Sequence, residues 1–235
     1  MINQQEFDAA LQADELFLEY MPTMNLSTGA CVGAEALVRW RRHGRIMPPL
    51  EFIPQIETTP MAGALTYWII DQVERELGTW IRKTDGIHIG INVPPAILGR
   101  GGLGYAMSKT NLRDMSHKFM FEVTERGVPD QLGLDGLEGL RQAKALVALD
   151  DVGLADANMV VLARSKVDVI KLDQSSLAHI LDSQKNQDEQ SPLAYLLQSK
   201  EMQIIAEGIE TLEQLQAVKQ IGVQMAQGWY FSKPI

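Results

Sequence analysis

Two residue types with rich chemistry, cysteine and histidine, are scarce in this 235-residue sequence. The one cysteine, Cys31, cannot form an internal disulfide, which suits a reducing compartment, and we interpret it as a small buried apolar residue. The histidines are scattered along the chain, and we interpret each as a surface or core residue: His43, His88, His117 and His179. Neither residue type supplies a constellation for catalysis or metal binding.

The sequence also lacks an excess of positive charge. It has 21 lysines and arginines against 30 aspartates and glutamates, a formal net charge of −9 and a pI near 5.0. Proteins that bind nucleic-acid polymers usually carry a basic surface, so we expect no polymeric nucleic acid as a partner. A small phosphate ligand is compatible with this charge where metal ions or a few placed cations offset it.

Long hydrophobic runs are absent as well. No apolar run approaches the roughly 20 residues that a membrane-spanning helix needs. The first residues, MINQQEFDAALQADE, have neither the basic nor the apolar region of a signal peptide. We therefore expect a cytoplasmic protein with no membrane segment in this chain.

What the sequence does contain is a regular alternation of short apolar segments with longer amphipathic ones. The predicted strands are Leu16–Tyr20, Val32–Trp40, Ile87–Asn92, Lys118–Glu122, Ala145–Asp150, Val167–Lys171, Gln203–Glu207 and Val223–Gln227. The predicted helices are Ala64–Arg82, Leu134–Lys144, Ala157–Ser165, Pro192–Lys200 and Leu212–Ile221, the last with a capping box that begins at Thr211. This alternation predicts an α/β fold, a closed (β/α)8 barrel of the TIM type, formed by a single domain over residues 1–235.

Polar side chains stand at the end of one predicted strand after another. They are Asn92, Glu122, Asp150, Asp151, Lys171, Glu207 and Gln227. In an α/β barrel the carboxyl ends of the strands meet at one rim, and catalytic groups gather there from different strands. Each residue alone has a more ordinary explanation as a helix cap, a turn or a solvated loop residue. Their joint placement at corresponding strand ends predicts a functional site.

Four carboxylates expected at this rim would repel one another: Glu35, Glu122, Asp150 and Glu207. Like charges about 4 Å apart raise the energy by several kcal/mol at a protein-like dielectric. Either the pKa values of these groups rise or cations neutralise them. Carboxylate oxygens and the amide of Asn92 are hard ligands, which favour Mg²⁺ or Mn²⁺ over Zn²⁺.

At these residues the sequence resembles the EAL-domain family of cyclic di-GMP phosphodiesterases. The signature tripeptide is Glu35-Ala36-Leu37 within GAEALVRW. It is followed by the motifs INVPP, FEVTERG, ALDDVG, VIKLD, AEGIET and QGWYFSKP. The tripeptide alone would carry no weight, whereas the ordered set is specific and spans nearly the whole chain.

The resemblance implies a modified barrel in which the first strand runs antiparallel to the others. It also implies Mg²⁺ or Mn²⁺ as cofactor, with two ions in each active site. The residues implied as ligands of the first ion are Glu35, Asn92, Glu122 and Asp150. Asp150 would bridge to the second ion, which Asp151 approaches and near which Glu207 lies as ligand or base.

Further roles follow from the same resemblance. The residues implied for catalysis are Lys171, which would hold and activate the attacking water, together with Glu207 and Glu35. Those implied for substrate binding and its support are Arg39, at a phosphate, Gln227, at water or the ligand, and Asp173 and Glu210 in the supporting shell. Glu125 would anchor the loop that follows Asp151.

The implied reaction is hydrolysis of one phosphodiester linkage of cyclic di-GMP, which opens the ring to the linear dinucleotide pGpG. Two metal ions about 3.5–4 Å apart would stabilise the attacking and leaving oxygens of such a displacement. The resemblance further implies a homodimer and fused or partner sensory or GGDEF domains.

Two departures from the family pattern leave alternatives open. The loop after the paired aspartates reads DDVGLADAN, where the family usually has a sequence close to DDFGTGYSS. Met21 stands where the family has glutamine, and methionine cannot offer a ligand the hydrogen bonds of an amide. The alternatives are a degenerate domain that binds cyclic di-GMP as a non-catalytic receptor, a protein-interaction module that no longer binds it, and a metal-dependent barrel hydrolase of a different phosphoester.

Overall fold

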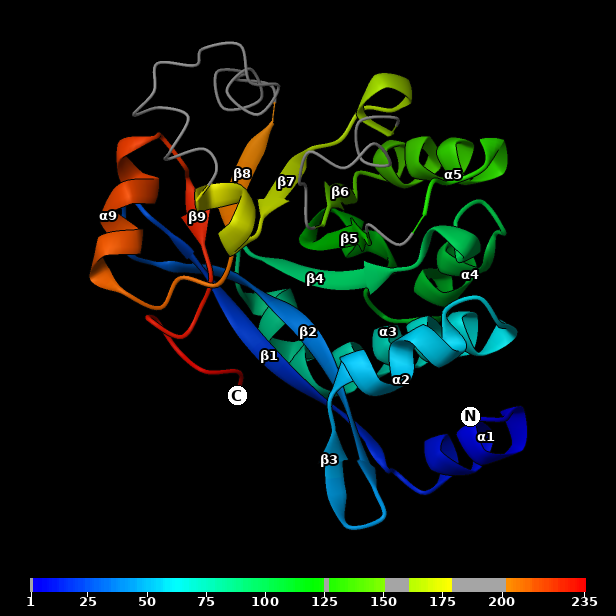
Figure 1. The fold of residues 1–235 in the computed structure, drawn as a ribbon. Coiled ribbons are helices and arrows are strands. Elements are labelled where there is room, and N and C mark those ends of the chain that lie inside the picture. The colour runs from blue at the N-terminus through cyan, green and yellow to red at the C-terminus, as the bar shows by residue number, and fades with distance from the viewer. Residues whose placement is uncertain (1, 125–126, 151–160, 179–201) are drawn as a thin grey trace.

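The structure, a computed structural model, describes residues 2–124, 127–150, 161–178 and 202–235. Its strands form one sheet that closes into a barrel (Figure 1). They are β1 (Leu16–Asn25), β2 (Cys31–Arg42), β3 (Arg45–Met47), β4 (His88–Val93), β5 (Phe119–Val123), β6 (Leu146–Leu149), β7 (Val169–Leu172), β8 (Gln203–Ala206) and β9 (Met225–Ala226). The order in the sheet is β1-β9-β8-β7-β6-β5-β4-β2-β3, and a further pairing of β1 with β2 closes the barrel.

The direction of β1 distinguishes this barrel from one with only parallel strands. β1 pairs antiparallel with both of its barrel neighbours, β2 and β9. The other barrel neighbours, from β2 through β4 to β9, are parallel to one another. The predicted α/β barrel with an antiparallel first strand is therefore confirmed.

One strand, β3, was not predicted. It extends β2 as an antiparallel hairpin outside the barrel, with Arg42 opposite Arg45. The two turn residues, His43 and Gly44, both have positive φ angles of 50° and 76°. Such a pair is typical of the tight turns that fit the twist of a two-residue hairpin loop. The glycine in this loop was the sequence signal for the turn.

The described helices cover the outside of the barrel. They are α1 (Gln4–Gln12), α2 (Pro49–Ile56), α3 (Pro60–Lys83), α4 (Gly102–Lys109), α5 (Gln131–Gln142) and α9 (Leu212–Gln220), with the 3-10 turns Pro95–Ile97 and Arg113–Lys118. The capping box predicted at Thr211 is confirmed, because its side chain accepts from the amide of Gln214 and the side chain of Gln214 accepts in return. Helices α1, α2 and α4 were not predicted.

The predicted helix boundaries were least accurate at the amino ends. α3 begins four residues earlier than expected because Thr59 accepts a hydrogen bond from the amide of Met61 and Pro60 suits a first helical position. α5 begins three residues early because Asp130 accepts from the amide of Gly133. The predicted helix 192–200 and the first part of the one at 157–165 lie outside the described residues, and residues 161–164 are helical.

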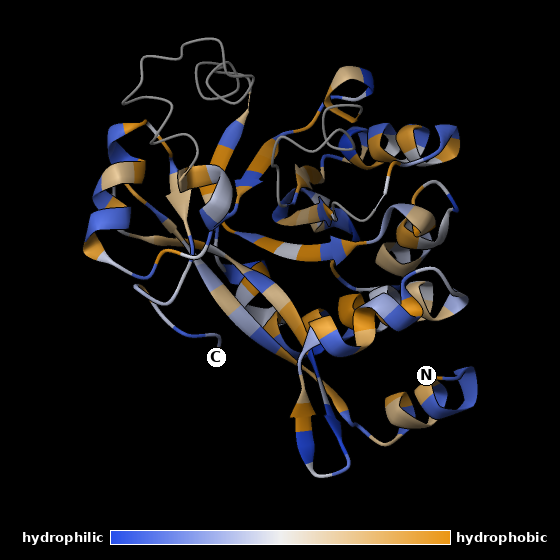
Figure 2. Ribbon diagram, in the orientation of Figure 1, coloured by the Kyte–Doolittle hydropathy of each residue, from blue (hydrophilic) through white to orange (hydrophobic). Residues whose placement is uncertain are grey.

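Two apolar cores support the barrel, one on each face of the sheet. Between the strands and the helices lies the larger core, in which Trp40 contacts Phe7 and Phe52 edge to face. The barrel interior has a small core of its own, formed by Met120, Ala148, Val169, Ile205 and Met225. The helices accordingly show hydrophobic and hydrophilic positions around their axes (Figure 2).

Three side chains interpreted from the sequence as surface or core can be checked directly. His43 and His117 are exposed and His88 is buried, as expected, while His179 lies outside the described residues. The interpretation of Cys31 as buried is wrong, because its side chain is exposed at the first residue of β2. Among the helices of the described residues, none has both the length and the apolar composition that a membrane span requires.

His88 lies in β4 with its side chain 8% exposed, and its Nε2 atom has no hydrogen-bond partner among the described residues. Burial, helped by the positive charge of Lys171, lowers the pKa of His88 to about 4. Above pH 6.5 the residue is neutral in both the folded and the unfolded chain, so His88 does not lower the free energy of unfolding there. As the pH falls from 6.5 to 4, the unfolded chain gains a proton that the folded protein does not take up, and stability decreases.

We therefore expect His88 to lower the free energy of unfolding by about 3 kcal/mol between pH 6.5 and pH 4. Urea unfolding of the wild type and of His88→Gln at both pH values measures this contribution. The glutamine variant should lose less stability than the wild type over the interval. An equal loss in the two proteins would contradict the assignment.

Candidate active site

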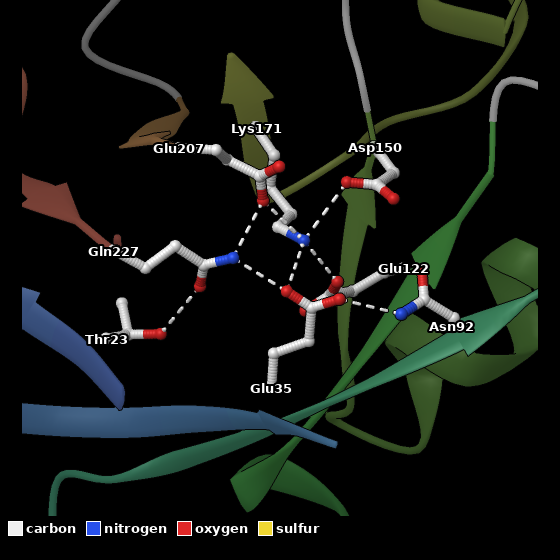
Figure 3. A network of polar contacts seen from close by, with 8 residues as sticks. All are labelled: Thr23, Glu35, Asn92, Glu122, Asp150, Lys171, Glu207 and Gln227. Atoms are coloured by element: carbon white, nitrogen blue, oxygen red, sulfur yellow. Dashed lines mark hydrogen bonds and ion pairs between the residues drawn. The ribbon is translucent and has the colours of Figure 1, made fainter. Parts of the chain in front are cut away.

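Lys171 occupies the centre of a cluster of carboxylates inside the barrel (Figure 3). Its side chain is 1% exposed. The Nζ atom lies 3.0 Å from Oε2 of Glu35, 2.5 Å from Oε2 of Glu122, 3.0 Å from Oδ1 of Asp150 and 2.6 Å from Oε1 of Glu207. These carboxylates come from β2, from β5 and from the ends of β6 and β8. The four carboxylates expected to meet at the rim therefore do so, and Lys171 lies among them.

Amide side chains complete the cluster. Nε2 of Gln227 donates to Oε2 of Glu35 at 2.7 Å and to Oε1 of Glu207 at 3.0 Å. Nδ2 of Asn92 donates to Oε1 of Glu35 at 2.7 Å. The hydroxyl group of Thr23 in β1 donates to Oε1 of Gln227 at 3.3 Å. Thr23 is 1% exposed. Thr23 was missed from the sequence, where a threonine in a strand carries no functional signal.

The sheet fixes these side chains through its backbone hydrogen bonds. Three of the residues follow the last residue of a strand and still belong to the ladder. The amide of Asp150 donates to the carbonyl of Val123, that of Glu207 to Leu172, and that of Gln227 to Ala206. Functional groups held by a rigid sheet keep their geometry better than groups on loops.

Gly90 makes room for the most buried carboxylate. It lies between His88 and Asn92 on the interior face of β4, opposite Glu35 in the parallel register. A β-carbon at Gly90 would overlap the Oε1 atom of Glu122. The absence of a side chain therefore allows Glu122, which is 0% exposed, to reach Lys171.

The electrostatics of the cluster are dominated by burial and by the excess of carboxylates over ammonium groups. Burial raises the pKa of Glu122 well above its usual value, and the negative charge of Glu35 adds to this. Burial also raises the pKa of Glu207 to about 8, although Lys171 opposes the shift. For Lys171 burial alone would lower the pKa, but the surrounding carboxylates, Asp150 first, outweigh it and raise the pKa well above the usual value.

Glu35 behaves differently from its neighbours. Burial would raise its pKa, but the charge of Lys171 and hydrogen bonds from Gln227 and Asn92 outweigh burial and lower it. Both of its oxygens accept hydrogen bonds. Glu35 is therefore held as a carboxylate at the centre of the network.

The donor atoms suit a hard divalent cation. They are carboxylate and amide oxygens, and Oε1 of Glu122 is buried with no hydrogen-bond partner among the described residues. Within the described residues no three acidic or histidine side chains form a ligand set by themselves. Lys171 lies where the four carboxylates converge, and its single positive charge leaves them in excess.

The remaining residues expected at the site lie at its edge or outside the description. Arg39 of β2 bonds to Glu19 at 2.8 Å. Asp173 accepts hydrogen bonds from Ser175 and Ser176 in the segment that follows β7. Glu210 is exposed directly before the cap of α9, and the structure does not bring its side chain into the cluster. Two further expected residues, Asp151 and Glu125, lie outside the described residues.

An apolar cavity of about 210 Å³ opens beside the carboxylates. Its walls come from β2, α2 and α3, and they include Leu37, Val38, Pro49, Ile53, Ile56, Leu65 and Ile69. Glu35, Asn92 and Asp150 lie at its boundary with the cluster, and Thr124 and Thr66 add polar groups. The arrangement offers an apolar wall for a flat ring next to a strongly charged centre.

Gly90→Ala should disturb the cluster, because the new methyl group would displace the Glu122 carboxylate from its contact with Lys171. Overpacking of this kind lowers the free energy of unfolding by about 1–3 kcal/mol, measurable by urea denaturation. Gly104→Ala in α4 is the matched control, because a β-carbon there meets nothing and alanine favours a helix. Equal effects of the two substitutions would show that Gly90 is not required for space.

The family model of the EAL domain matches residues 4–234 of the chain. The probable cyclic di-GMP phosphodiesterase PdeB of Escherichia coli K12 is 29% identical, over 96% of this chain and 44% of its own length. The probable cyclic di-GMP phosphodiesterase PdeG of the same organism is 31% identical, over 96% and 46%. The chain thus spans less than half the length of these curated relatives.

Solved structures show the same architecture. The EAL enzyme Bd1971, in a form with cAMP and cyclic di-GMP bound, matches with a TM-score of 0.84 and 27% identity, over 98% of this chain and 65% of that chain. The PaMucR phosphodiesterase in complex with c-di-GMP matches with a TM-score of 0.83 and 23% identity, over 98% and 96%, which supports the fold alone. The family match over nearly the full sequence confirms the resemblance of the motifs, and the chain belongs to the EAL domain family.

Proposed function

We propose that this chain is a metal-dependent phosphodiesterase that hydrolyses cyclic di-GMP to linear pGpG. The observation that carries the proposal is the convergence of four carboxylates on Lys171 at the carboxyl end of the barrel. An excess of buried carboxylates in this position suits divalent cations and a phosphate ester. Relatives named as probable cyclic di-GMP phosphodiesterases, at 29–31% identity, support the same substrate.

The metal ions proposed are Mg²⁺ or Mn²⁺, two in each site. The residues that would hold the first are Glu35, Asn92, Glu122 and Asp150, and those at the second are Asp150, Asp151 and Glu207. When bound, such ions polarise the phosphodiester and lower the pKa of water. Oε1 of Glu122 has no hydrogen-bond partner among the described residues, and the raised pKa of the group indicates that its charged form lacks compensation, which a bound cation would supply.

Side chains of the protein would orient the reactants around this centre. Lys171 is held as an ammonium, so it can donate hydrogen bonds to the attacking water but does not serve as a base. Gln227 is fixed by Thr23 and Glu35, and its amide would position water or the ligand. Arg39 would bind a phosphate oxygen, with Asp173 and Glu210 in support, and Glu125 would anchor the neighbouring loop.

The apolar cavity would receive a guanine base of the dinucleotide. Its volume of about 210 Å³ and its aliphatic walls suit a planar ring. The cavity adjoins Asn92 and Asp150, so a base seated there would place the attached ribose and phosphate toward the carboxylates. For the whole protein we further propose a cytoplasmic location, a homodimer, and sensory or GGDEF domains as fused or separate partners.

Met21 favours one alternative, a receptor that binds cyclic di-GMP without cleaving it. Met21 is opposite Glu35 in the antiparallel register and is 9% exposed, so it lies against the site and offers no amide to a ligand. Calorimetry with Ca²⁺ in place of Mg²⁺ separates the non-catalytic cases. A receptor binds the nucleotide under these conditions, and a protein-interaction module does not.

Incubation of the purified protein with cyclic di-GMP and Mg²⁺ or Mn²⁺ should yield pGpG, detected by chromatography. Glu35→Ala should lower the rate by about a hundredfold or more, because even groups that only support metal ligands contribute up to that factor. Glu51→Ala, which removes an exposed carboxylate from α2, is the matched control and should leave the rate unchanged.

Wild-type protein that forms no more pGpG than Glu35→Ala would refute the catalytic proposal. Faster cleavage of a generic aryl phosphodiester than of cyclic di-GMP would instead indicate a hydrolase of a different phosphoester.

A further inference from the structure

Arg39, the residue proposed to bind phosphate, is held by a carboxylate that belongs to none of the motifs. Its Nε atom donates to Oε2 of Glu19 at 2.8 Å, and Nη1 donates to the carbonyl of Val38 at 3.0 Å. The side chains of Arg39 and Glu19 are 17% and 30% exposed, against 60% and 43% for the surface pair Arg45–Glu51. The Arg39–Glu19 pair is therefore the more enclosed of the two, which favours a fixed geometry.

The register of the two strands explains the contact. In the antiparallel pair of β1 and β2, Met21 is opposite Glu35 and Glu19 is opposite Leu37. Residues two apart in a strand share a face, and diagonal neighbours across a pair lie within reach of long side chains. Glu19 and Arg39 therefore lie on the face that carries Glu35, further along β2 toward its carboxyl end.

The contact leaves part of the guanidinium free. A guanidinium has five N–H donors in a rigid planar fork. Glu19 and Val38 use one donor on Nε and one on Nη1, and no other acceptor among the described residues bonds to Arg39. The remaining donors include one on Nη1 and both on Nη2. These two nitrogens form the end of the fork, which can bind two phosphate oxygens side by side.

We propose that Glu19 is a positioning residue, which holds Arg39 through Nε and thereby presents the Nη1–Nη2 end of the guanidinium to a phosphate of the nucleotide. This inference rests on the function proposed above. It assigns to β1 a positioning residue outside the family motifs, because Glu19 lies two residues before Met21, the position where the family has glutamine.

The carboxylate of Glu19 has two opposing effects on a bound phosphate. Its hydrogen bond restricts the orientations of Arg39, which favours binding, whereas its negative charge repels the phosphate. Two substitutions separate these effects. Glu19→Gln removes the charge but keeps an oxygen that accepts from Nε, and Glu19→Ala removes both. Because the two variants carry the same charge, any difference between them reports the hydrogen bond.

The experiment measures the Kd for cyclic di-GMP by calorimetry with Ca²⁺, and KM and kcat with Mg²⁺, for the wild type and both variants. We expect Kd and KM to be about three- to fivefold higher in Glu19→Ala than in Glu19→Gln. kcat should be the same in both, because the carboxylate cluster is untouched. Glu51→Ala, from the exposed Arg45–Glu51 pair, should match the wild type in all three quantities.

The same two substitutions are then combined with Arg39→Lys. A lysine keeps the charge, so binding stays measurable, but it has no fork to orient. The difference between the alanine and glutamine variants should disappear in this background. Thermal unfolding serves as the control: equal Tm values for the two variants would show that a difference in folding does not cause the difference in Kd.

Two results would overturn the inference: equal Kd values for the two Glu19 variants, or an undiminished difference in the presence of Arg39→Lys. Wild-type protein that neither binds nor cleaves cyclic di-GMP would refute the proposed function itself. Wild-type protein that does so, with Glu19 variants that do not differ, would refute only the role of Glu19.

Discussion

A single buried ammonium group inside four carboxylates is the interaction on which the barrel mouth depends. Taking a charge out of water is costly, and the opposing charge compensates for this only where the geometry and the hydrogen bonds are good. Lys171 meets that condition through four contacts of 2.5–3.0 Å. Without its positive charge, no basic side chain among the described residues would form an ion pair with these four carboxylates. The cluster therefore ties β2, β5, β6, β7 and β8 together as well as forming the site.

The charged cluster also determines what the rest of the barrel interior can contain. The small interior core, represented by Met120, Val169 and Ile205, offers no polar group to share with the carboxylates. Apolar surroundings strengthen the electrostatic interactions of the cluster, because they lower the local dielectric constant. This is why burial is the largest influence on the pKa values of Glu122 and Glu207.

Much of the site was predictable from the sequence because parallel strands place their carboxyl ends at one rim. Asn92, Glu122, Asp150 and Glu207 follow apolar runs, so their convergence required only the correct strand assignment. The central position of Lys171 was not derivable in this way, because a lysine in a strand more often reaches toward solvent. Its distances depend on side-chain conformations that no sequence pattern specifies.

Other features depend on registers that are invisible in a single sequence. The antiparallel direction of β1 came from the family resemblance and not from periodicity, because an alternating pattern reads the same in both directions. The contact of Thr23 with Gln227 joins residues from the two ends of the chain, and it exists only because β1 lies beside both β2 and β9. Of the helices missed from the sequence, α1 begins at the cap residue Asn3 and α2 at Pro49, whereas α4 follows Gly101 with no side-chain cap.

The antiparallel course of β1 also gives one strand an unusual share of the mouth. The parallel strands β4 to β9 contribute residues at or just after their carboxyl ends, whereas β1 runs beside β2 over most of its length (Figure 1). Its alternate residues meet successive parts of the site: Thr23 bonds to Gln227, Met21 faces Glu35, and Glu19 bonds to Arg39. None of the three belongs to the carboxylate cluster. Changes at these positions can therefore alter how a ligand is held while the charged centre stays intact, and the methionine at position 21 is such a change.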